Sequence, residues 1–177
     1  MCVDTVANHI VTISPRRIEN LFNRCIQQLA KQGMFPKNIY AACDCTLYET
    51  TRKFEGCGSV THKRKVKARG RRKNGELKEV KVTLYGWKVW AVYEIKTGIP
   101  LSIKIDTIEK PDNRHVLAVL EQAKENVKPF STIDSLVLDR GFLDGKILYD
   151  IDLQGLEFVI PLKRNMDAAK DARQLAL

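Results

Sequence analysis

Two features of exported and membrane proteins are missing from this sequence. No apolar run approaches the roughly 20 residues that a membrane-spanning helix needs. Residues 1–14 lack the basic, apolar and small-residue regions of a signal peptide. Cysteines are few, five in 177 residues, and their odd number does not suit a complete disulfide framework. The sequence therefore predicts a cytoplasmic protein with free thiols and no membrane partner.

Acidic residues are outnumbered, 21 against 30 Lys and Arg, which gives a formal net charge of +9. This balance favours an anionic partner, with nucleic acid as the first candidate. A basic domain without such a partner is the alternative. The hydrophobic fraction of 44% excludes a disordered chain, and the length predicts one domain with a real core.

The chain is organised around a short apolar run that ends in a carboxylate, Ser135 to Asp139, followed by Arg140, Gly141 and Phe142. The run predicts a buried strand, and the glycine predicts a tight exit from it. A helical pattern follows from about Asp144. Asp139 is therefore expected at the carboxyl end of a core strand, where open α/β sheets bind their ligands.

A second apolar strand, Ile39 to Thr46, is interrupted by Asp44. An aspartate inside an apolar strand is costly to bury unless it has a partner. Two such aspartates suggest one shared partner, and a divalent metal satisfies both. A zinc site built from Cys43, Cys45, Cys57 and His62 is the weaker alternative, because this spacing fits no common zinc pattern well.

The remaining patterns predict helices and strands in alternation. Helices are expected from Ser14-Pro15 to Gly33, after 111–113 and over 144–154, and strands over 80–95, 101–105 and 158–162. The inward face of the first helix is predicted to comprise Ile18, Leu21, Phe22, Cys25, Ile26 and Leu29. The apolar alternation changes parity after Gly86, which predicts a bulge there. The hairpin gives an antiparallel edge and the helical crossovers give parallel neighbours, so the strands of Asp44 and Asp139 can lie side by side.

Residues 51–79 are poor in apolar side chains and are predicted to be a basic insertion loop. Like charges repel one another in this segment, and a phosphate backbone would offset the repulsion. A solvated loop without a partner is the alternative. The predicted DNA-binding residues are Lys63, Arg64, Lys65, Lys67, Arg69, Arg71, Arg72 and Lys73.

Several motifs in this order resemble the DDE transposases of bacterial and archaeal insertion sequences. They are Asp44-Cys45-Thr46, Gly86-Trp87-Lys88, residues 96–100 (Lys-Thr-Gly-Ile-Pro), Asp139-Arg140-Gly141-Phe142 and residues 158–163 (Phe-Val-Ile-Pro-Leu-Lys). The resemblance covers roughly Tyr40 to Arg164, and its two aspartates are 95 positions apart.

The resemblance implies an α/β, RNase H-like fold: a mixed sheet with an antiparallel hairpin edge, parallel strands and flanking helices. It also implies metal-dependent phosphodiester cleavage and strand transfer during DNA transposition. Asp44 and Asp139 would be the first two catalytic, metal-binding carboxylates, for Mg²⁺ (or Mn²⁺) in a two-metal site. Arg140 would steady the site or a DNA phosphate, or else form a surface ion pair. DNA is the expected partner, a homodimer on DNA is left open, and the setting is cytoplasmic and nucleoid-associated.

The domain organisation expected from these patterns has three parts. Residues 1–36 form an N-terminal helical lead-in, 37–164 a partial catalytic core with the basic loop at about 51–79, and 165–177 a tail.

The family's third carboxylate is a Glu in a Tyr-x-x-Arg-x-x-x-Glu-x-x-x-x-x-x-Lys pattern, and nothing after Arg164 matches it. Asp167 and Asp171 are poor substitutes. A truncated, inactive remnant that only binds DNA is therefore the alternative function, and another RNase H-like nuclease is a third.

Overall fold

The structure is a computed structural model that describes residues 13–67, 77–162, 166, 167, 169, 170 and 174. In chain order, its elements are α2 (Pro15–Lys31), β1 (Asn38–Thr50), β2 (Gly58–Lys67), β3 (Leu77–Glu94), β4 (Pro100–Thr107), η1 (Asp112–His115), α3 (Val116–Val127), β5 (Thr132–Leu138), η2 (Arg140–Phe142), α4 (Gly145–Leu153) and β6 (Glu157–Val159). No described helix is long and apolar enough to cross a membrane.

The strands form one mixed sheet in the order β2-β3-β1-β5-β6, with β4 paired to β3. Strands β2 and β3 are antiparallel, whereas β1, β5 and β6 are parallel to one another. The two helical crossovers, through α3 and α4, are the connections that parallel neighbours need. The predicted fold, antiparallel at one side and parallel at the other with flanking helices, is confirmed.

The chain divides into two compact units. The first comprises residues 1–45, 90–105 and 111–177, and holds the described helices α2, α3 and α4 with strands β5 and β6. The second comprises residues 46–89 and 106–110, and holds β2 with most of β3. The predicted division at residues 36 and 164 stays a prediction.

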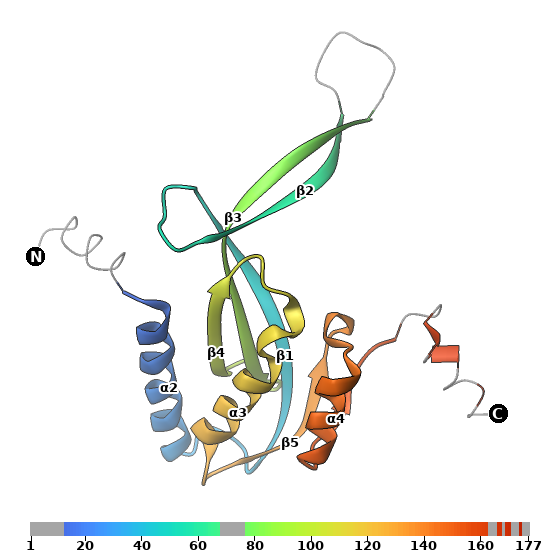
Figure 1. Ribbon diagram of the computed structural model, residues 1–177. Coiled ribbons are helices and arrows are strands. Elements are labelled where there is room, and N and C mark those ends of the chain that lie inside the picture. The colour runs from blue at the N-terminus through green and yellow to red at the C-terminus, as the bar shows by residue number, and fades with distance from the viewer. Residues whose placement is uncertain (1–12, 68–76, 163–165, 168, 171–173, 175–177) are drawn as a thin grey trace, which may run out of the picture. The chain divides into compact units, whose positions relative to one another are not determined.

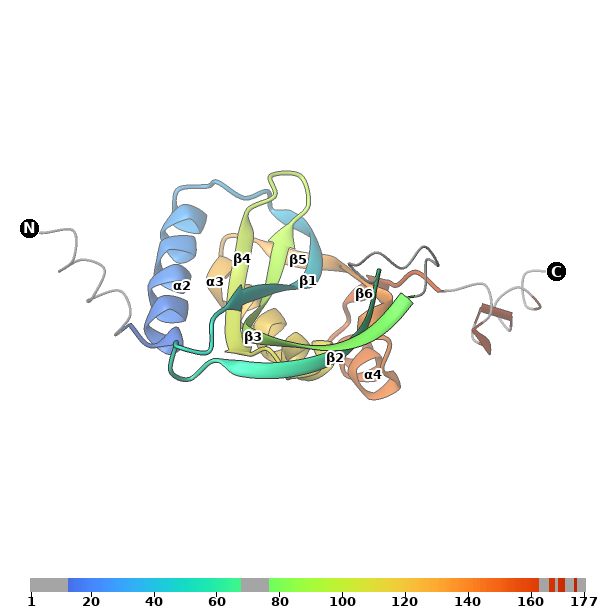
Figure 2. The ribbon, with the colours of Figure 1, turned by 90° about the horizontal axis from the view of Figure 1, so that it is seen from above.

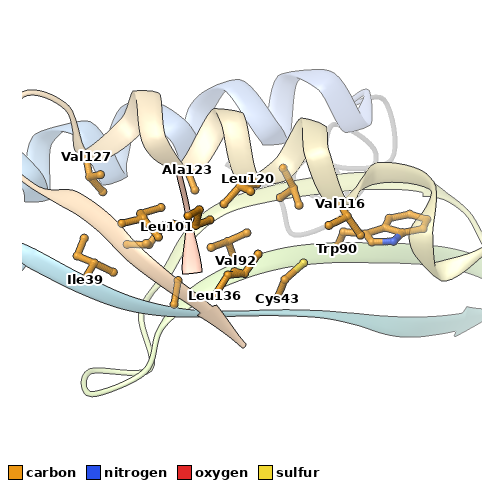
Figure 3. Close-up of a cluster of buried hydrophobic side chains, with 14 of the residues drawn as sticks. Ile39, Cys43, Trp90, Val92, Leu101, Val116, Leu120, Ala123, Val127 and Leu136 are labelled. Atoms are coloured by element: carbon orange, nitrogen blue, oxygen red, sulfur yellow. The ribbon is translucent and has the colours of Figure 1, made fainter. Parts of the chain in front are cut away.

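The core of the first unit lies between α3 and the strands beneath it (Figure 3). Apolar side chains of α3 point at the strands, and alternate residues of β1 and β5 point back at them. Figure 2 shows α2 beside α3. Residues that share this core include Ile39, Ala41, Cys43, Trp90, Val92, Leu101, Val116, Leu120, Ala123, Val127, Leu136 and Leu138.

Helix α2 is amphipathic as predicted, but its inward face is rotated from the prediction. Ile18 and Cys25 are exposed, and 66% of Leu21 is exposed. Glu19 is buried instead, because its carboxylate accepts hydrogen bonds from the Lys104 Nζ (2.9 Å) and from the Ile105 amide (2.8 Å). This pairing turns α2 toward β4 through a polar contact that hydrophobic periodicity does not detect.

A buried asparagine joins α2, α3 and β4. The Asn126 side chain is 1% exposed, and its Nδ2 donates to Asn23 Oδ1 (2.9 Å) and to the Leu101 carbonyl (2.8 Å). Its Oδ1 accepts from Gln27 Nε2 (3.1 Å) and Gln122 Nε2 (2.9 Å). All of the donors and acceptors of this side chain are therefore hydrogen-bonded, which offsets the free-energy cost of burying it.

The predicted parity change at Gly86 is wrong. The more buried positions keep one parity along β3, from Val82 through Gly86 and Lys88 to Trp90 and Glu94. Charged residues occupy two of these inward positions, and both have partners. The Lys88 ammonium donates to the Lys110 carbonyl (2.5 Å), and the Glu94 carboxylate accepts from the amides of the turn that follows. Because Lys88 and Glu94 occupy inward positions where apolar residues are expected, the hydrophobic pattern of this regular strand changes parity in the sequence.

The predicted structureless loop at 51–79 is also wrong for much of its length. Residues 58–67 form β2, and residues 77–79 begin β3. The two strands pair without a shift of register from Gly58–Gly86 to Lys67–Leu77. Figure 1 shows them as a twisted two-stranded ribbon.

Candidate active site

The two predicted catalytic aspartates follow a pair of register partners on adjacent parallel strands. Strands β1 and β5 lie side by side (Figure 1). Cys43 of β1 is aligned with Leu138, the last residue of β5; Asp44 is the next residue of β1, and Asp139 directly follows the end of β5. Neighbouring strands are about 4.8 Å apart, so the two aspartates begin from adjacent backbone positions. The structure therefore brings these two predicted site residues together.

Alternation along the strands separates the aspartates from the core. Cys43 and Leu138 are 2% and 1% exposed and point into the core, whereas Asp44 and Asp139 are exposed. Asp139 keeps an extended backbone, with φ −73° and ψ 158°. Because successive side chains in extended chain point to opposite faces, both carboxylates lie on the face away from that core.

Each carboxylate is oriented by the amide that follows it. Asp44 Oδ1 accepts from the Cys45 N–H and Asp139 Oδ1 accepts from the Arg140 N–H, both at 2.7 Å. No hydrogen bond to the second oxygen of either group occurs among the residues that the structure describes. One oxygen of each carboxylate is thus available to an external ligand.

The turn after Asp139 is anchored by Phe142. This side chain is 1% exposed, and its amide donates to the Asp139 carbonyl (3.0 Å) to close the short helix η2. Helix α4 then begins at Gly145. The side chain of its N-cap, Asp144, accepts hydrogen bonds from Lys146 N (Oδ1, 3.0 Å) and from Asn113 Nδ2 (Oδ2, 3.1 Å). Asp139 is therefore followed by a turn that a buried aromatic ring and a capped helix hold in place.

The positive charge of the chain is concentrated in the β2–β3 segment. Residues 58–86 contain ten Lys or Arg and two Glu, a net charge of +8, whereas the whole chain carries +9. Lys63, Arg64 and Lys65 lie on β2 with exposed side chains, and Lys67 is its last residue. The other predicted DNA-binding residues, Arg69, Arg71, Arg72 and Lys73, lie outside the described residues.

Comparison with known families matches residues 52–176 to a model of the transposase DDE domain. The chain belongs to this family. The match includes the basic strands and the Asp139 turn of this transposase domain, while Asp44 lies just before it. A search of curated proteins finds no match. Membership identifies a transposase catalytic domain and implies a DNA substrate.

The acidic pair of the transposase domain suits a hard divalent cation. Carboxylate oxygens are preferred ligands of Mg²⁺, and sites that act on phosphates often use only one or two carboxylates, with water and substrate oxygens completing the shell. Within the described residues, no three His, Cys, Asp or Glu side chains gather to form a metal site. The exposed carboxylates described at this position are those of Asp44 and Asp139.

Arg140 is exposed beside this pair, and no ion pair involves it in the described part of the transposase domain. A surface ion pair was the alternative predicted from the sequence for this residue. A guanidinium can form paired hydrogen bonds with the oxygens of a phosphate as well as with a carboxylate.

The cysteines do not extend the acidic site. Burial, with smaller contributions from the nearby Cys45 and Asp44, raises the pKa of the Cys43 thiol to about 12, so it stays neutral. The Cys57 thiol donates to the Phe54 carbonyl (3.0 Å). None of the four cysteines that the structure describes forms a disulfide, and no metal cluster includes them or His62 among those residues. The zinc alternative gains no support.

Sequence reasoning missed the β2–β3 ribbon and, with it, Lys81. Lys81 of β3 is the register partner of Lys63 on β2. The signal was present in residues 60–65, Val-Thr-His-Lys-Arg-Lys, where β-branched residues begin a strand whose later positions are charged. If only the charges of this segment are counted, and the two-residue alternation of a strand is not considered, the segment is predicted to be a loop.

Proposed function

We propose that this transposase domain performs metal-dependent phosphodiester cleavage and strand transfer, with Asp44 and Asp139 as its metal-binding carboxylates. The observation that carries the proposal is the parallel pairing of Cys43 with Leu138, because each of these two residues is followed in the chain by an aspartate. Family membership supports the same reaction class.

The acidic pair favours a cation for an electrostatic reason. Two carboxylates on adjacent backbone positions repel each other when both are ionised. A cation between them removes that repulsion and gains hard oxygen ligands. Two such ions roughly 4 Å apart would activate an attacking water or 3′-hydroxyl and stabilise the leaving oxygen of a phosphodiester.

The surrounding residues hold this arrangement in place. The Cys45 and Arg140 amides fix one oxygen of each carboxylate, and the buried Phe142 holds the turn. Arg140 is exposed and follows Asp139 in the chain, so its guanidinium would neutralise a phosphate bound there. The basic segment 58–86 attracts the DNA through its charge of +8.

DNA binding without cleavage is the second candidate. The concentration of charge in residues 58–86 favours it, because that feature requires no catalytic site. A nicking assay on supercoiled plasmid separates the two candidates. Nicking that needs Mg²⁺ or Mn²⁺ and is abolished by Asp44→Asn and by Asp139→Asn supports the enzyme. Asp152→Asn, an exposed carboxylate on α4, is the matched control and should nick normally. Plasmid binding without nicking by the wild-type chain would favour the second candidate.

A further inference from the structure

The β2–β3 ribbon has two chemically different faces. Directly opposed residues of an antiparallel pair share a face, so the register assigns every side chain. Among the residues whose side chains the structure describes, the first face, here called the lysine face, consists of Ser59, Thr61, Lys63, Lys65, Glu79, Lys81, Thr83 and Tyr85. The second, here called the valine face, consists of Val60, His62, Arg64, Val80, Val82 and Leu84.

The charges of the lysine face are not neutralised within the ribbon. Lys63 lies directly opposite Lys81, and like charges in this position destabilise a strand pair. Lys65 lies opposite Glu79, but the two form no ion pair. Three exposed ammonium groups therefore share this face with one carboxylate, and an external anion would relieve their repulsion.

Hydroxyl groups lie beside these lysines. Thr61 Oγ1 and Thr83 Oγ1 are 3.0 Å apart, one residue pair along the face from Lys63 and Lys81. Each hydroxyl can donate one hydrogen bond and accept two. The lysine face thus presents a compact hydrogen-bonding centre next to a cluster of positive charges, a combination that suits base edges flanked by phosphates.

The dimensions of the ribbon select one groove of DNA. Two paired strands are about 4.8 Å apart, and side chains add to that width. The major groove is about 12 Å wide and admits a two-stranded ribbon, whereas the minor groove is about 6 Å wide and does not. On the valine face, Arg64 lies opposite Val80 and His62 opposite Val82, so that face would bury apolar side chains against phosphates without gaining partners.

We propose that the β2–β3 ribbon enters the major groove of duplex DNA with its lysine face inward. Lys63, Lys65 and Lys81 contact phosphates, and the Thr61–Thr83 pair contacts base edges. The proposal rests on the proposed function only in taking DNA as the substrate. It assigns the ribbon a recognition role that is separate from the chemistry at Asp44 and Asp139.

Neighbouring residues on opposite faces provide the test. Lys63→Ala and Arg64→Ala each remove one exposed positive charge from adjacent positions of β2. Affinity for a short duplex is measured by fluorescence anisotropy over a range of salt concentrations, in the presence of chelator. Lys63→Ala is expected to weaken binding about tenfold and to reduce the salt slope by about 0.9, the value of one phosphate contact, while Arg64→Ala changes both much less. Equal effects of the two variants would overturn the assignment of faces.

The groove is tested with modified DNA. Methylation of guanine N7 modifies the major groove alone, and should weaken binding, whereas a ligand that fills the minor groove should not. The opposite pattern would overturn the proposal, as would single-stranded DNA that binds as tightly as the duplex. Thermal melting of each variant confirms its fold. Because chelator prevents cleavage, failure here leaves the nicking result unaffected, and failure of nicking leaves this binding result unaffected.

Discussion

Cys43 is aligned with Leu138 across two parallel strands, and this one pairing sets two exposed aspartates side by side above a buried layer. The apolar pair fixes the register, because a shift by one residue would turn Asp44 or Asp139 into the core. The free energy gained by burying Cys43 and Leu138 therefore keeps the two mutually repelling carboxylates of Asp44 and Asp139 close together. Like-charge repulsion between the two ionised aspartates is a cost that a bound cation would remove.

The first prediction concerns that repulsion. Asp44→Asn should leave the free energy of unfolding unchanged or raise it by up to about 0.5 kcal/mol without metal, because it removes one of two neighbouring negative charges. Its amide oxygen still accepts from the Cys45 N–H. Urea denaturation in the presence of chelator measures the change. A loss of several kcal/mol would show that the carboxylate stabilises the fold.

The second prediction tests the anchor of the Asp139 turn. Phe142→Ala should lower the free energy of unfolding by about 3–5 kcal/mol, because it empties a site that is 1% exposed. Leu143→Ala, the next residue and 36% exposed, is the control and should cost about 1 kcal/mol or less. Urea denaturation at neutral pH compares them. Similar losses in the two variants would contradict the role assigned to Phe142.

How far the sequence determined this site can be judged residue by residue. Asp44 and Asp139 were predictable because each interrupts or ends an apolar strand, where an unpaired charge needs a reason. The partnership of Glu19 with Lys104 was not, because polar contacts between distant elements leave no periodic signal. Lys88 and Glu94 concealed the parity of β3 because their partners are a distant carbonyl and a local turn. The β2–β3 ribbon was missed because its strands carry charge where most strands carry apolar side chains.

The third prediction concerns pH. Burial alone would raise the pKa of Glu94, but hydrogen bonds from Thr97 and Lys96 and the Lys96 charge outweigh burial and hold this pKa below its ordinary value. Because its pKa is lower in the folded state, ionised Glu94 contributes to the free energy of unfolding at pH values above the pKa of the unfolded chain, about 4.3. This contribution is lost as the pH falls through the pKa of the folded state. Glu94→Gln should cost about 2 kcal/mol at pH 7, because its amide group can accept through only one of the two carboxylate positions.

The stability difference between wild type and Glu94→Gln should narrow as the pH falls below about 4.3. Thermal or urea unfolding across this range measures it, with Glu125→Gln, an exposed residue of α3, as the control that shows little change. A difference that stays constant from pH 7 to pH 3 would contradict the role of the Glu94 charge.

The fourth prediction concerns a close backbone approach within the second unit. A Cβ added at Gly86 would lie 2.1 Å from the Tyr48 carbonyl oxygen, which is too close for any atom. Gly86→Ala should therefore destabilise by about 1–3 kcal/mol, since backbone must move to admit it. At Gly145, the first residue of α4, no atom lies within 4 Å of the added Cβ, so Gly145→Ala should be neutral or stabilise by up to about 1 kcal/mol. Urea denaturation of both variants measures these changes in the free energy of unfolding. No change for Gly86→Ala would contradict the close approach of Gly86 to the Tyr48 carbonyl.

The central claim is that Asp44 and Asp139 hold one shared cation site, and titration of the chain with Mn²⁺, followed by the loss of the free-ion electron paramagnetic resonance signal, tests it most directly. The account predicts binding by the wild-type chain that Asp44→Asn and Asp139→Asn each weaken by about tenfold or more, and that Asp152→Asn leaves unchanged. Wild-type binding that neither Asp44→Asn nor Asp139→Asn reduces would contradict it.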